Sequence, residues 1–339
     1  MDTDDYNKLR YEQLPWTEKY RPKMVDDLIL DENLKYRIKQ IISDKNKSIP
    51  NLIFTGPPGI GKTSTIRSIA RELYGSYVNR AVLELNASDD RGIKSIQGDI
   101  INFCKAKLIY PRGQEDKYSK YKMIILDEAD NMVDRAQPQI NNIMEAYKDT
   151  VKFAFTCNSS SNIIEAIQSR CLILRYMRLS SDLVAKKLKE IALCEKIKYE
   201  DIAMKRISEL SHGDLRVAVN TLQLVFNNKG IIKCDYVDEL CDLPQQVIIK
   251  KLFDFVLKDD LISAFKIMYE LKNSGYSGSD ITLGMIYTLK SEVSSDIPEK
   301  IKINLFNSIC MGAYRISKGI DSVLQLASCI VDMSKFKNN

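Results

Sequence analysis

The amino-acid sequence predicts an α/β core with a parallel five-stranded sheet, followed by two domains made only of helices. Three observations carry this prediction. Between residues 50 and 176, short apolar runs of β type alternate with helical stretches, which is typical of βαβ units and a parallel sheet. A glycine-rich segment that suits phosphate binding follows the first run and opens the first helix. From Ser180 onward, apolar residues recur at helical spacing only.

The five expected strands are rich in β-branched and large apolar residues, and they lie at 52–55, 82–85, 123–127, 151–157 and 172–176. A helix is expected over 64–74, where the residues of one apolar face recur at helical spacing: Ile66, Ile69, Ala70 and Leu73. Gly75 follows this helix and is predicted to end it, since glycine is favoured just past a helix terminus. The polar stretch 111–120 is predicted to form an exposed loop before the third strand.

The rest of the chain is predicted to be helical. Ser180, Ser181 and Asp182 are candidate caps for a helix that continues through Ile191, and Asp214 is expected to cap another. The segment 242–244, Asp-Leu-Pro, is typical of a linker, and further helices follow it. A length of 339 residues suggests two or three domains at ~150 residues each. We therefore expect a core at 1–177, a helical domain at 178–240 and a second helical domain at 241–339.

Composition and charge narrow the class of protein. A net charge of +5 is too slight to mark a free-standing nucleic-acid binder. No apolar run approaches the ~18 residues that a membrane span needs. The acidic start lacks the build of a signal or transit peptide, which favours an intracellular location.

Cysteine and histidine usage argues against a metal-stabilised fold. The eight cysteines never form a C-x-x-C pair, and the single histidine, His212, is too little to complete a Cys/His zinc set. We expect reduced thiols, mostly buried, because free cysteine behaves as a small apolar residue. His212 is expected to be a loop or cap residue.

The phosphate-binding segment connects the first expected strand to the first expected helix, which is the context that this motif requires. Its glycines allow backbone N–H groups to close on phosphates at the positive end of the helix. Lys62 would reach the β- and γ-phosphates, and Thr63 would ligate Mg²⁺. The nucleotide-binding candidates are Gly56, Pro57, Pro58, Gly59, Ile60, Gly61, Lys62, Thr63 and Ser64.

Two carboxylates end the third expected strand. Asp127 suits a Mg²⁺ ligand and Glu128 suits a residue that activates water, since ligands of open α/β folds bind at the carboxyl ends of strands. Residues 127–130 read Asp-Glu-Ala-Asp, which also occurs in DEAD-box RNA helicases. That class needs a second ATPase lobe with further motifs, whereas the chain beyond residue 180 is helical.

Four more polar residues occupy positions of interest. Asn158 ends the fourth strand, where it would hold the attacking water or simply favour a turn. Asn86 ends the second strand, and Arg170 precedes the fifth. Arg216 falls in the first turn of a helix, where a cation opposes the helix dipole unless an anion such as a phosphate binds nearby.

Six segments together resemble the sequence boxes of replication factor C small subunits, which are AAA+ ATPases of the sliding-clamp loader. These segments are Leu14–Pro22, Gly56–Thr63, Leu83–Gly92, Ile124–Asp130, Ser169–Cys171 and Gly213–Arg216. The resemblance extends from about Leu14 to the final helix. Residues 154–158 and 168–176 are most similar to the subunit 2 or 4 type.

The resemblance implies a function and a set of partners. It implies a P-loop AAA+ ATPase core at 1–177, a helical lid at 178–240 and a helical collar, used for oligomerisation, at 241–339. It also implies a heteropentamer that uses ATP and Mg²⁺ to open a ring-shaped sliding clamp, place it on primer–template DNA and release it upon hydrolysis.

Residue roles follow from the same resemblance. Thr17 and Ile29 would flank the adenine, Glu128 would act as the base, and Asn158 and Arg216 would sense the γ-phosphate. Arg170 becomes an arginine finger that reaches the ATP of a neighbouring subunit, which explains its place outside the motifs of its own site. The remaining implied roles are a switch at Asn86 and DNA contacts at Arg91, Ile93 and Lys94.

Two departures from the family pattern affect the expected DNA contacts. Family members usually carry basic residues where this chain has Asn141 and Asn142, and also near Gln97 and Asp99. We therefore expect this subunit to contribute less to DNA binding than its sister subunits, since phosphate contacts supply affinity.

Two other functions stay open at this point. The chain is alternatively an ATP-binding, mainly structural subunit of the same complex, or another AAA+ DNA-processing ATPase such as a branch-migration motor. A nuclear location follows if the host cell is nucleated, and a viral or archaeal origin stays open.

Overall fold

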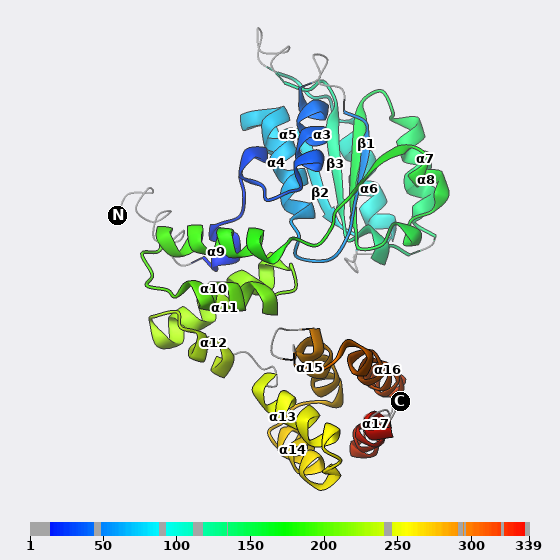
Figure 1. Cartoon of the computed structure of the whole chain (residues 1–339). Helices are drawn as coiled ribbons and strands as arrows, with labels where there is room; N and C mark the ends of the chain where they lie inside the picture. The colour runs from blue at the N-terminus through cyan, green and yellow to red at the C-terminus, as the bar shows by residue number, and fades with distance from the viewer. Residues whose placement is uncertain are drawn as a thin grey trace. The chain divides into compact units, whose positions relative to one another are not determined.

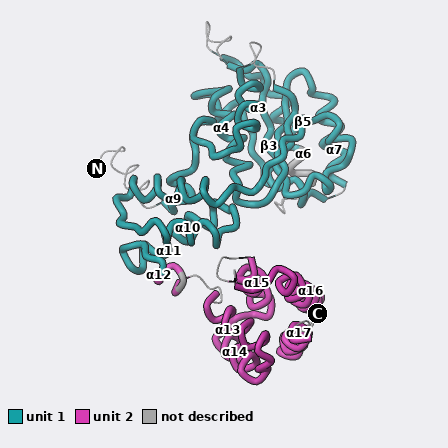
Figure 2. Tube along the Cα trace, viewed as in Figure 1, with its two compact units in different colours: residues 1–234 teal, residues 235–339 magenta. Residues whose placement is uncertain are grey.

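The computed structural model describes residues 14–43, 49–87, 93–110, 118–133, 135–240, 246–290, 294, 296–319 and 322–335, without the side chains of 93–97 and 238. The chain divides into two compact units, residues 1–234 and 235–339 (Figure 2). The division falls at the start of helix α12 (Cys234–Leu240). The expected linker at 242–244 lies outside the described residues.

A five-stranded parallel sheet forms the centre of the first unit (Figure 1). Its order is β2-β3-β4-β1-β5, and the strands are β1 (Asn51–Thr55), β2 (Val82–Asn86), β3 (Lys122–Asp127), β4 (Val151–Cys157) and β5 (Cys171–Arg175). The predicted parallel sheet is confirmed. The fifth strand ends one residue earlier than expected, although the N–H of Tyr176 still donates to Thr55 O at 2.8 Å.

Alternating side chains of the strands build two cores, one on each face of the sheet. On β3, Met123 and Ile125 belong to one core, whereas Ile124 and Leu126 belong to the other. Helices α3 (Glu32–Ile42), α4 (Lys62–Tyr74) and α5 (Val78–Ala81) contribute to the first core. Helices α6 (Ile93–Lys105), α7 (Gln137–Ala146) and α8 (Glu165–Gln168) contribute to the second. Both faces are therefore covered, as a parallel sheet requires.

Helix α4 matches the expectation for 64–74 and begins two residues earlier. Its predicted apolar face is fully buried: Ile66, Ile69, Ala70 and Leu73. Gly75 ends it with a φ of 53°, and a Cβ on this glycine would lie 2.8 Å from the Tyr118 ring. Glycine is therefore required at this position.

A helical segment completes the first unit and contains α9 (Ser181–Cys194), α10 (Asp201–Leu210) and α11 (Leu215–Lys229). Of the three candidate caps of α9, Ser180 is the one that forms, because its side chain accepts from Leu183 N. The predicted cap at Asp214 is confirmed, since its side chain accepts from the N–H groups of Arg216 and Val217. His212 lies in the turn before α11, as expected of a loop residue.

An N-terminal segment joins this helical segment to the sheet and its helices. Helix α2 (Trp16–Lys19) packs on α11, where the rings of Trp16 and Phe226 lie 5.5 Å apart. Lys19 Nζ and Tyr20 Oη donate to Glu195 Oε1 at 2.5 and 2.6 Å. Further along, Val25 N donates to the carboxylate of Glu72 on α4.

The second unit is helical and has its own core. After α12, its helices are α13 (Gln246–Leu257), α14 (Leu261–Asn273), α15 (Gly278–Lys290), α16 (Glu299–Ser317) and α17 (Val323–Lys335). Leu252, Phe253, Met285, Ile309 and Ile330 are among its fully buried apolar residues. Each helix thus buries one apolar face against the others.

The expectation that the cysteines are mostly buried is wrong for the described residues. All are free thiols, but only Cys104, Cys157 and Cys329 are buried, and Cys194 is exposed. Most of the described thiols thus lie at helix or strand positions that face partly toward solvent. Among the described residues, the helices are all too short or too polar to cross a membrane.

Candidate nucleotide-binding site

A cavity of about 420 Å³ opens where the carboxyl ends of the central strands meet the helical segment. The N-terminal segment, the phosphate-binding loop and helices α9 and α11 all contribute side chains to it. Most residues predicted to bind nucleotide line this cavity, namely Thr17, Ile29, Pro58, Gly59, Ile60, Gly61, Lys62, Thr63, Ser64, Asp127, Glu128, Asn158 and Arg216. Gly56 and Pro57 do not line it but lie directly behind Lys62.

The phosphate-binding loop needs glycine at defined positions. Gly59 and Gly61 have φ values of 70° and 92°, in the left-handed region that favours glycine. A Cβ on Gly59 would also lie 1.8 Å from an oxygen of Asp214. The loop is in direct contact with α11, because Leu215 N donates to Gly59 O at 3.1 Å. The first residues of α4, Lys62, Thr63 and Ser64, line the cavity, so the positive end of the helix dipole lies there, which suits phosphate.

Lys62 is held by backbone and side-chain oxygens. Its Nζ donates to Gly56 O at 2.5 Å, to Pro57 O at 2.8 Å and to Asn158 Oδ1 at 3.0 Å. Burial lowers the pKa of Lys62. A phosphate oxygen is a stronger acceptor than these carbonyls, so the ammonium group is placed to exchange them for a nucleotide.

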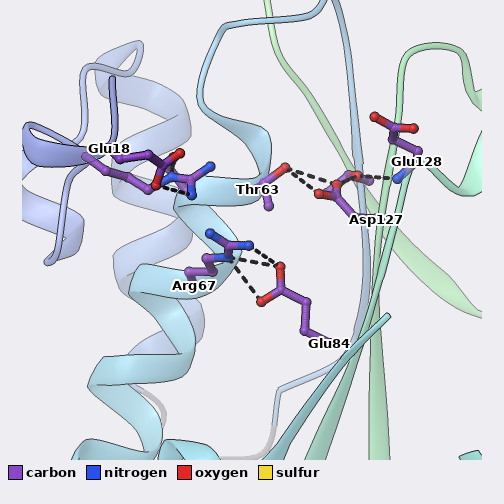
Figure 3. A network of polar contacts seen from close by, with 9 residues as sticks. Glu18, Thr63, Arg67, Glu84, Asp127 and Glu128 are labelled. Carbon is purple, nitrogen blue, oxygen red and sulfur yellow. Dashed lines mark hydrogen bonds and ion pairs between the residues drawn. The ribbon is translucent and has the colours of Figure 1, made fainter. Parts of the chain in front are cut away.

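Thr63 and Asp127 form the oxygen pair expected at a magnesium site (Figure 3). Thr63 Oγ1 lies 3.0 and 3.1 Å from the two carboxylate oxygens of Asp127. Hydroxyl and carboxylate oxygens are ligands that Mg²⁺ accepts, and it usually takes the others from phosphates and water. The described residues hold no group of three or more histidine, cysteine or acidic side chains that could bind a metal ion.

Glu128 follows directly and has an unusual backbone. Its φ of 54° is in the left-handed region, which is uncommon for a residue with a side chain and is often found at functional sites. Its N–H donates to Thr156 Oγ1 at 3.0 Å, and its exposed carboxylate accepts from Asn131 Nδ2 at 3.3 Å. This conformation turns the chain sharply at the end of β3 and presents the carboxylate at the cavity.

Asn158 and Arg216 approach the same cavity from different elements. Asn158 follows β4, and its backbone N–H donates to Asp130 Oδ2 at 3.0 Å. Arg216 lies in the first turn of α11, whose N-terminus is capped by Asp214. The other carboxylate oxygen of Asp130, Oδ1, is buried without a hydrogen-bond partner.

The other predicted residues lie elsewhere. Arg170 is outside the cavity, where it forms an ion pair with Glu145 on α7 and donates to Ala166 O at 2.8 Å. Asn86 ends β2 in register with Asp127 but does not line the cavity. Arg91 lies outside the described residues, as do the side chains of Ile93 and Lys94 at the start of α6.

Several residues of the cavity were not predicted from the sequence: Arg21, Asp130, Thr156 and Lys187. Arg21 Nε lies 3.3 Å from Ser64 Oγ in the first turn of α4. Thr156 and Asn158 are two residues apart, and such residues share one face of a strand. That spacing is the signal that could have identified Thr156 as a neighbour of the site.

Comparisons with known proteins agree with this geometry. Residues 52–179 match the ATPase family associated with various cellular activities (AAA), and residues 244–332 match the replication factor C C-terminal domain. The probable replication factor C subunit 2 of Dictyostelium discoideum is 39% identical over 330 residues, which cover 96% of this chain and 94% of that protein. This chain belongs to the replication factor C family.

A second relative supports the same assignment. Replication factor C subunit 4 of Saccharomyces cerevisiae is 38% identical over 327 residues, which cover 96% of this chain and 97% of that protein. The predicted resemblance is confirmed, and the chain is an ATPase subunit of the clamp-loader type, part of a multi-subunit complex. The same finding removes a DEAD-box helicase and an unrelated AAA+ motor from consideration.

The fold also has a solved counterpart. The Holliday junction branch migration motor RuvB of Thermotoga maritima is similar in structure, with a TM-score of 0.53 and 18% sequence identity. The match covers 70% of this replication factor C chain and 80% of that chain. At this identity the similarity concerns the fold alone.

Proposed function

We propose that this chain binds MgATP in the cavity and hydrolyses it in order to load a sliding clamp onto primer–template DNA. The observation that carries this proposal is the meeting of Lys62, Thr63, Asp127 and Glu128 at one edge of the sheet. A cationic group for phosphate, an oxygen pair for metal and an exposed carboxylate are the parts that phosphoryl transfer to water needs.

Each residue then has a defined role in the reaction. Lys62 exchanges the carbonyls of Gly56 and Pro57 for the β- and γ-phosphates. Thr63 and Asp127 hold Mg²⁺, which neutralises charge on the phosphates when bound. Glu128 accepts a proton from the attacking water. The other end of the nucleotide is held by Thr17 and Ile29, which flank the adenine.

Asn158 and Arg216 report whether a γ-phosphate is present. Asn158 Oδ1 accepts from Lys62, the residue proposed to bind the phosphates, so the amide lies where it can contact the γ-phosphate or the attacking water. Arg216 approaches from α11, which is also bonded to the loop through Leu215 and Gly59. Nucleotide thereby links the proposed lid, residues 178–240, to the ATPase core.

Assembly completes the site. Arg170 lies away from its own cavity, so it serves as an arginine finger for the nucleotide of a neighbouring subunit. Residues 241–339 form the collar that joins the subunits of a heteropentamer. Hydrolysis then depends on the interface, which couples the ATP state to assembly.

DNA and clamp are the proposed macromolecular partners. Arg91, Ile93 and Lys94 contact DNA phosphates at or near the start of α6, and DNA stimulates hydrolysis. Asn86 lies in register with Asp127 and acts as the switch between DNA and the catalytic carboxylates. In a nucleated host, the protein acts in the nucleus.

A second candidate function is supported by one observation. On α7, the chain has Asn141 and Asn142 at positions where its resemblance to the family implies arginines, and Asn141 Oδ1 is buried without a hydrogen-bond partner. This loss favours a subunit that binds ATP but whose own turnover is dispensable for clamp loading.

The Glu128→Gln variant tests the proposed function. In the complex assembled with its sister subunits, this variant is expected to bind ATP with unchanged affinity, because no phosphate contact is removed. Its own site is expected to lose hydrolysis by about a hundredfold or more, since the proton acceptor is lost. ATP binding and phosphate release are the measurements.

Glu270→Gln on α14 is the matched control, because Glu270 is exposed and belongs to the second unit. It should leave both measurements unchanged. Normal turnover at the Glu128→Gln site would contradict the proposed mechanism. Loss of turnover with normal clamp loading would favour the mainly structural subunit instead.

A further inference from the structure

Thr156 lies at the point where three functional elements meet. It belongs to β4, pairs with Phe54 of β1 and is two residues before Asn158. Its side chain is 2% exposed and lines the cavity. The β3–β4 ladder ends with Leu126 and Phe155, so Thr156 lies beside the point where β3 turns away at Asp127 and Glu128.

The hydroxyl of Thr156 makes two hydrogen bonds whose directions are fixed by chemistry. It accepts from the N–H of Glu128 at 3.0 Å, and it donates to Asp127 Oδ1. An amide N–H can only donate and an ionised carboxylate can only accept, so the hydroxyl proton must point toward Asp127. One side chain on β4 thus fixes the metal-binding carboxylate and the backbone of the catalytic carboxylate.

The backbone of Glu128 and the carboxylate of Asp127 both need contacts from other residues to keep their orientation. Glu128 has a left-handed backbone, which is unfavourable for a residue with a Cβ, and the bond from its N–H to Thr156 helps to hold it. The Asp127 carboxylate lies between the hydroxyls of Thr63 and Thr156, so its plane cannot rotate without breaking one of these contacts. Such restraint is what a precise metal and water geometry requires.

We propose that Thr156 is a positioning residue for hydrolysis, which aligns Asp127 for the metal and Glu128 for the attacking water. This inference rests on the proposed function, because it assumes the roles given to both carboxylates. The same hydroxyl ties β3 to β4, so that Asn158, two residues further on, keeps a constant distance from Glu128. A buried hydroxyl of purely structural value would affect folding stability but would leave the chemical step unchanged.

Thr156→Val tests this role in the full chain assembled with its sister subunits. Valine keeps the branched shape and lacks the hydroxyl. We expect kcat for ATP hydrolysis to fall by about tenfold to a hundredfold, while KM stays within about threefold, because one positioning contact is lost and no phosphate contact is removed. Thr156→Ser keeps the hydroxyl and should restore kcat to within about threefold of the wild-type value.

A second readout does not depend on turnover. In the isolated full chain, binding of a fluorescent ATP analogue is titrated with Mg²⁺. The Thr156→Val variant should need several times more Mg²⁺ to reach half of its metal-dependent affinity, because Asp127 is no longer held in place. Binding without Mg²⁺ should not change.

Thr282→Val is the matched control. Thr282 is 1% exposed, and its hydroxyl donates back to Gly278 O and Ser279 O within α15 of the second unit. This variant loses an equally buried hydroxyl, so hydrolysis and Mg²⁺ dependence should both stay at wild-type values. If Thr156→Val does not fold, Thr156→Ala carries the test with the same expected values.

The inference is overturned if Thr156→Val keeps the wild-type kcat and Mg²⁺ dependence, or if Thr156→Ser is as impaired as Thr156→Val. The Glu128→Gln variant separates this failure from failure of the proposed function. An inactive Glu128→Gln site with a normal Thr156→Val site removes only the role of Thr156. An active Glu128→Gln site removes the proposed function itself.

Discussion

The nucleotide cavity and the core of the second unit both bury hydroxyl groups, but they satisfy them in different ways. In the second unit, Thr282 and Ser308 donate to carbonyls four residues earlier in their own helices. In the cavity, Thr63 of α4 and Thr156 of β4 both bond to Asp127, which lies on a third element, β3. Bonds within one helix survive any rigid movement of that helix, whereas bonds between elements fix their relative positions.

This difference indicates where precision is needed. The second unit is held mainly by apolar packing, which tolerates small shifts because the attraction is not directional. The cavity is held by directional polar contacts between β1, β3, β4 and α4, and these contacts require the strands to keep one register. Substitutions in the cavity should therefore change the rate of ATP hydrolysis. Substitutions in the core of the second unit should change its free energy of unfolding.

Arg170→Ala should give the largest effect on hydrolysis, because it removes the proposed arginine finger, which lies outside the cavity of its own chain. In the assembled complex, hydrolysis is expected to fall by about a thousandfold or more at the neighbouring site that receives the finger. The isolated chain should show no change, since Arg170 does not line its own cavity. Phosphate release is the measurement in both states.

Arg80→Ala is a suitable control for the loss of an arginine, because Arg80 is exposed on α5 and lies outside the cavity. It should leave hydrolysis unchanged in both states. An equal loss of hydrolysis by Arg170→Ala in the isolated chain would contradict the action in trans.

Leu252→Ala should affect stability alone. Leu252 is fully buried on α13, so its truncation is expected to cost about 2–5 kcal/mol of the free energy of unfolding of the second unit. The chain has a single tryptophan, Trp16, which packs on Phe226 in the first unit and reports only on that unit. Urea unfolding followed by circular dichroism and by Trp16 fluorescence therefore separates the two regions.

The dichroism transition of the second unit should move to lower urea, while the fluorescence transition and ATP binding by the isolated chain stay unchanged. Val247→Ala on the same helix is the control, because Val247 is 61% exposed and its truncation should be nearly neutral. A matching shift in the Trp16 transition would show that the two regions do not unfold separately.

The sequence was most informative where the decisive signals are local. The phosphate-binding loop is a continuous motif, and the caps at Ser180 and Asp214 depend on neighbours within three residues, so each could be predicted directly. The apolar runs likewise predicted five strands within a residue or two at each end. Family resemblance then supplied roles for residues whose own environment is not distinctive.

Contacts between distant residues could not be predicted in the same way. The strand order places β4 between β3 and β1, and only that order brings Thr156 to Asp127 and Glu128. The ion pair of Arg170 with Glu145 joins a loop to α7, and no periodicity indicates it. The expectation of mostly buried cysteines failed for a related reason, since residue type alone does not say which face of a helix a thiol occupies.

Glu195→Gln should give the smallest effect, a small loss in the free energy of unfolding. It tests whether polar contacts between elements stabilise the fold in addition to fixing its geometry. Although burial raises the pKa of Glu195, hydrogen bonds from Lys19 and Tyr20 outweigh it, and the net pKa is lowered. A carboxyl whose pKa is lower in the folded state stabilises that state above its ordinary pKa of about 4.3, and this stabilisation is lost as the pH falls below it. The variant should therefore lose about 1 kcal/mol at pH 7.

Trp16 fluorescence is well placed to measure this loss, because Trp16 lies in the same segment as Lys19 and Tyr20. The stability difference between wild type and Glu195→Gln should be full at pH 7 and should shrink as the pH drops through the acid range, since the wild-type carboxyl then becomes neutral too. Glu190→Gln breaks an exposed ion pair with Lys187 inside α9. It should lower the free energy of unfolding by less than about 0.5 kcal/mol, both at pH 7 and in acid. A difference that persists unchanged into acid would mean that the hydrogen-bonding shape of Glu195, and not its charge, ties the N-terminal segment to α9.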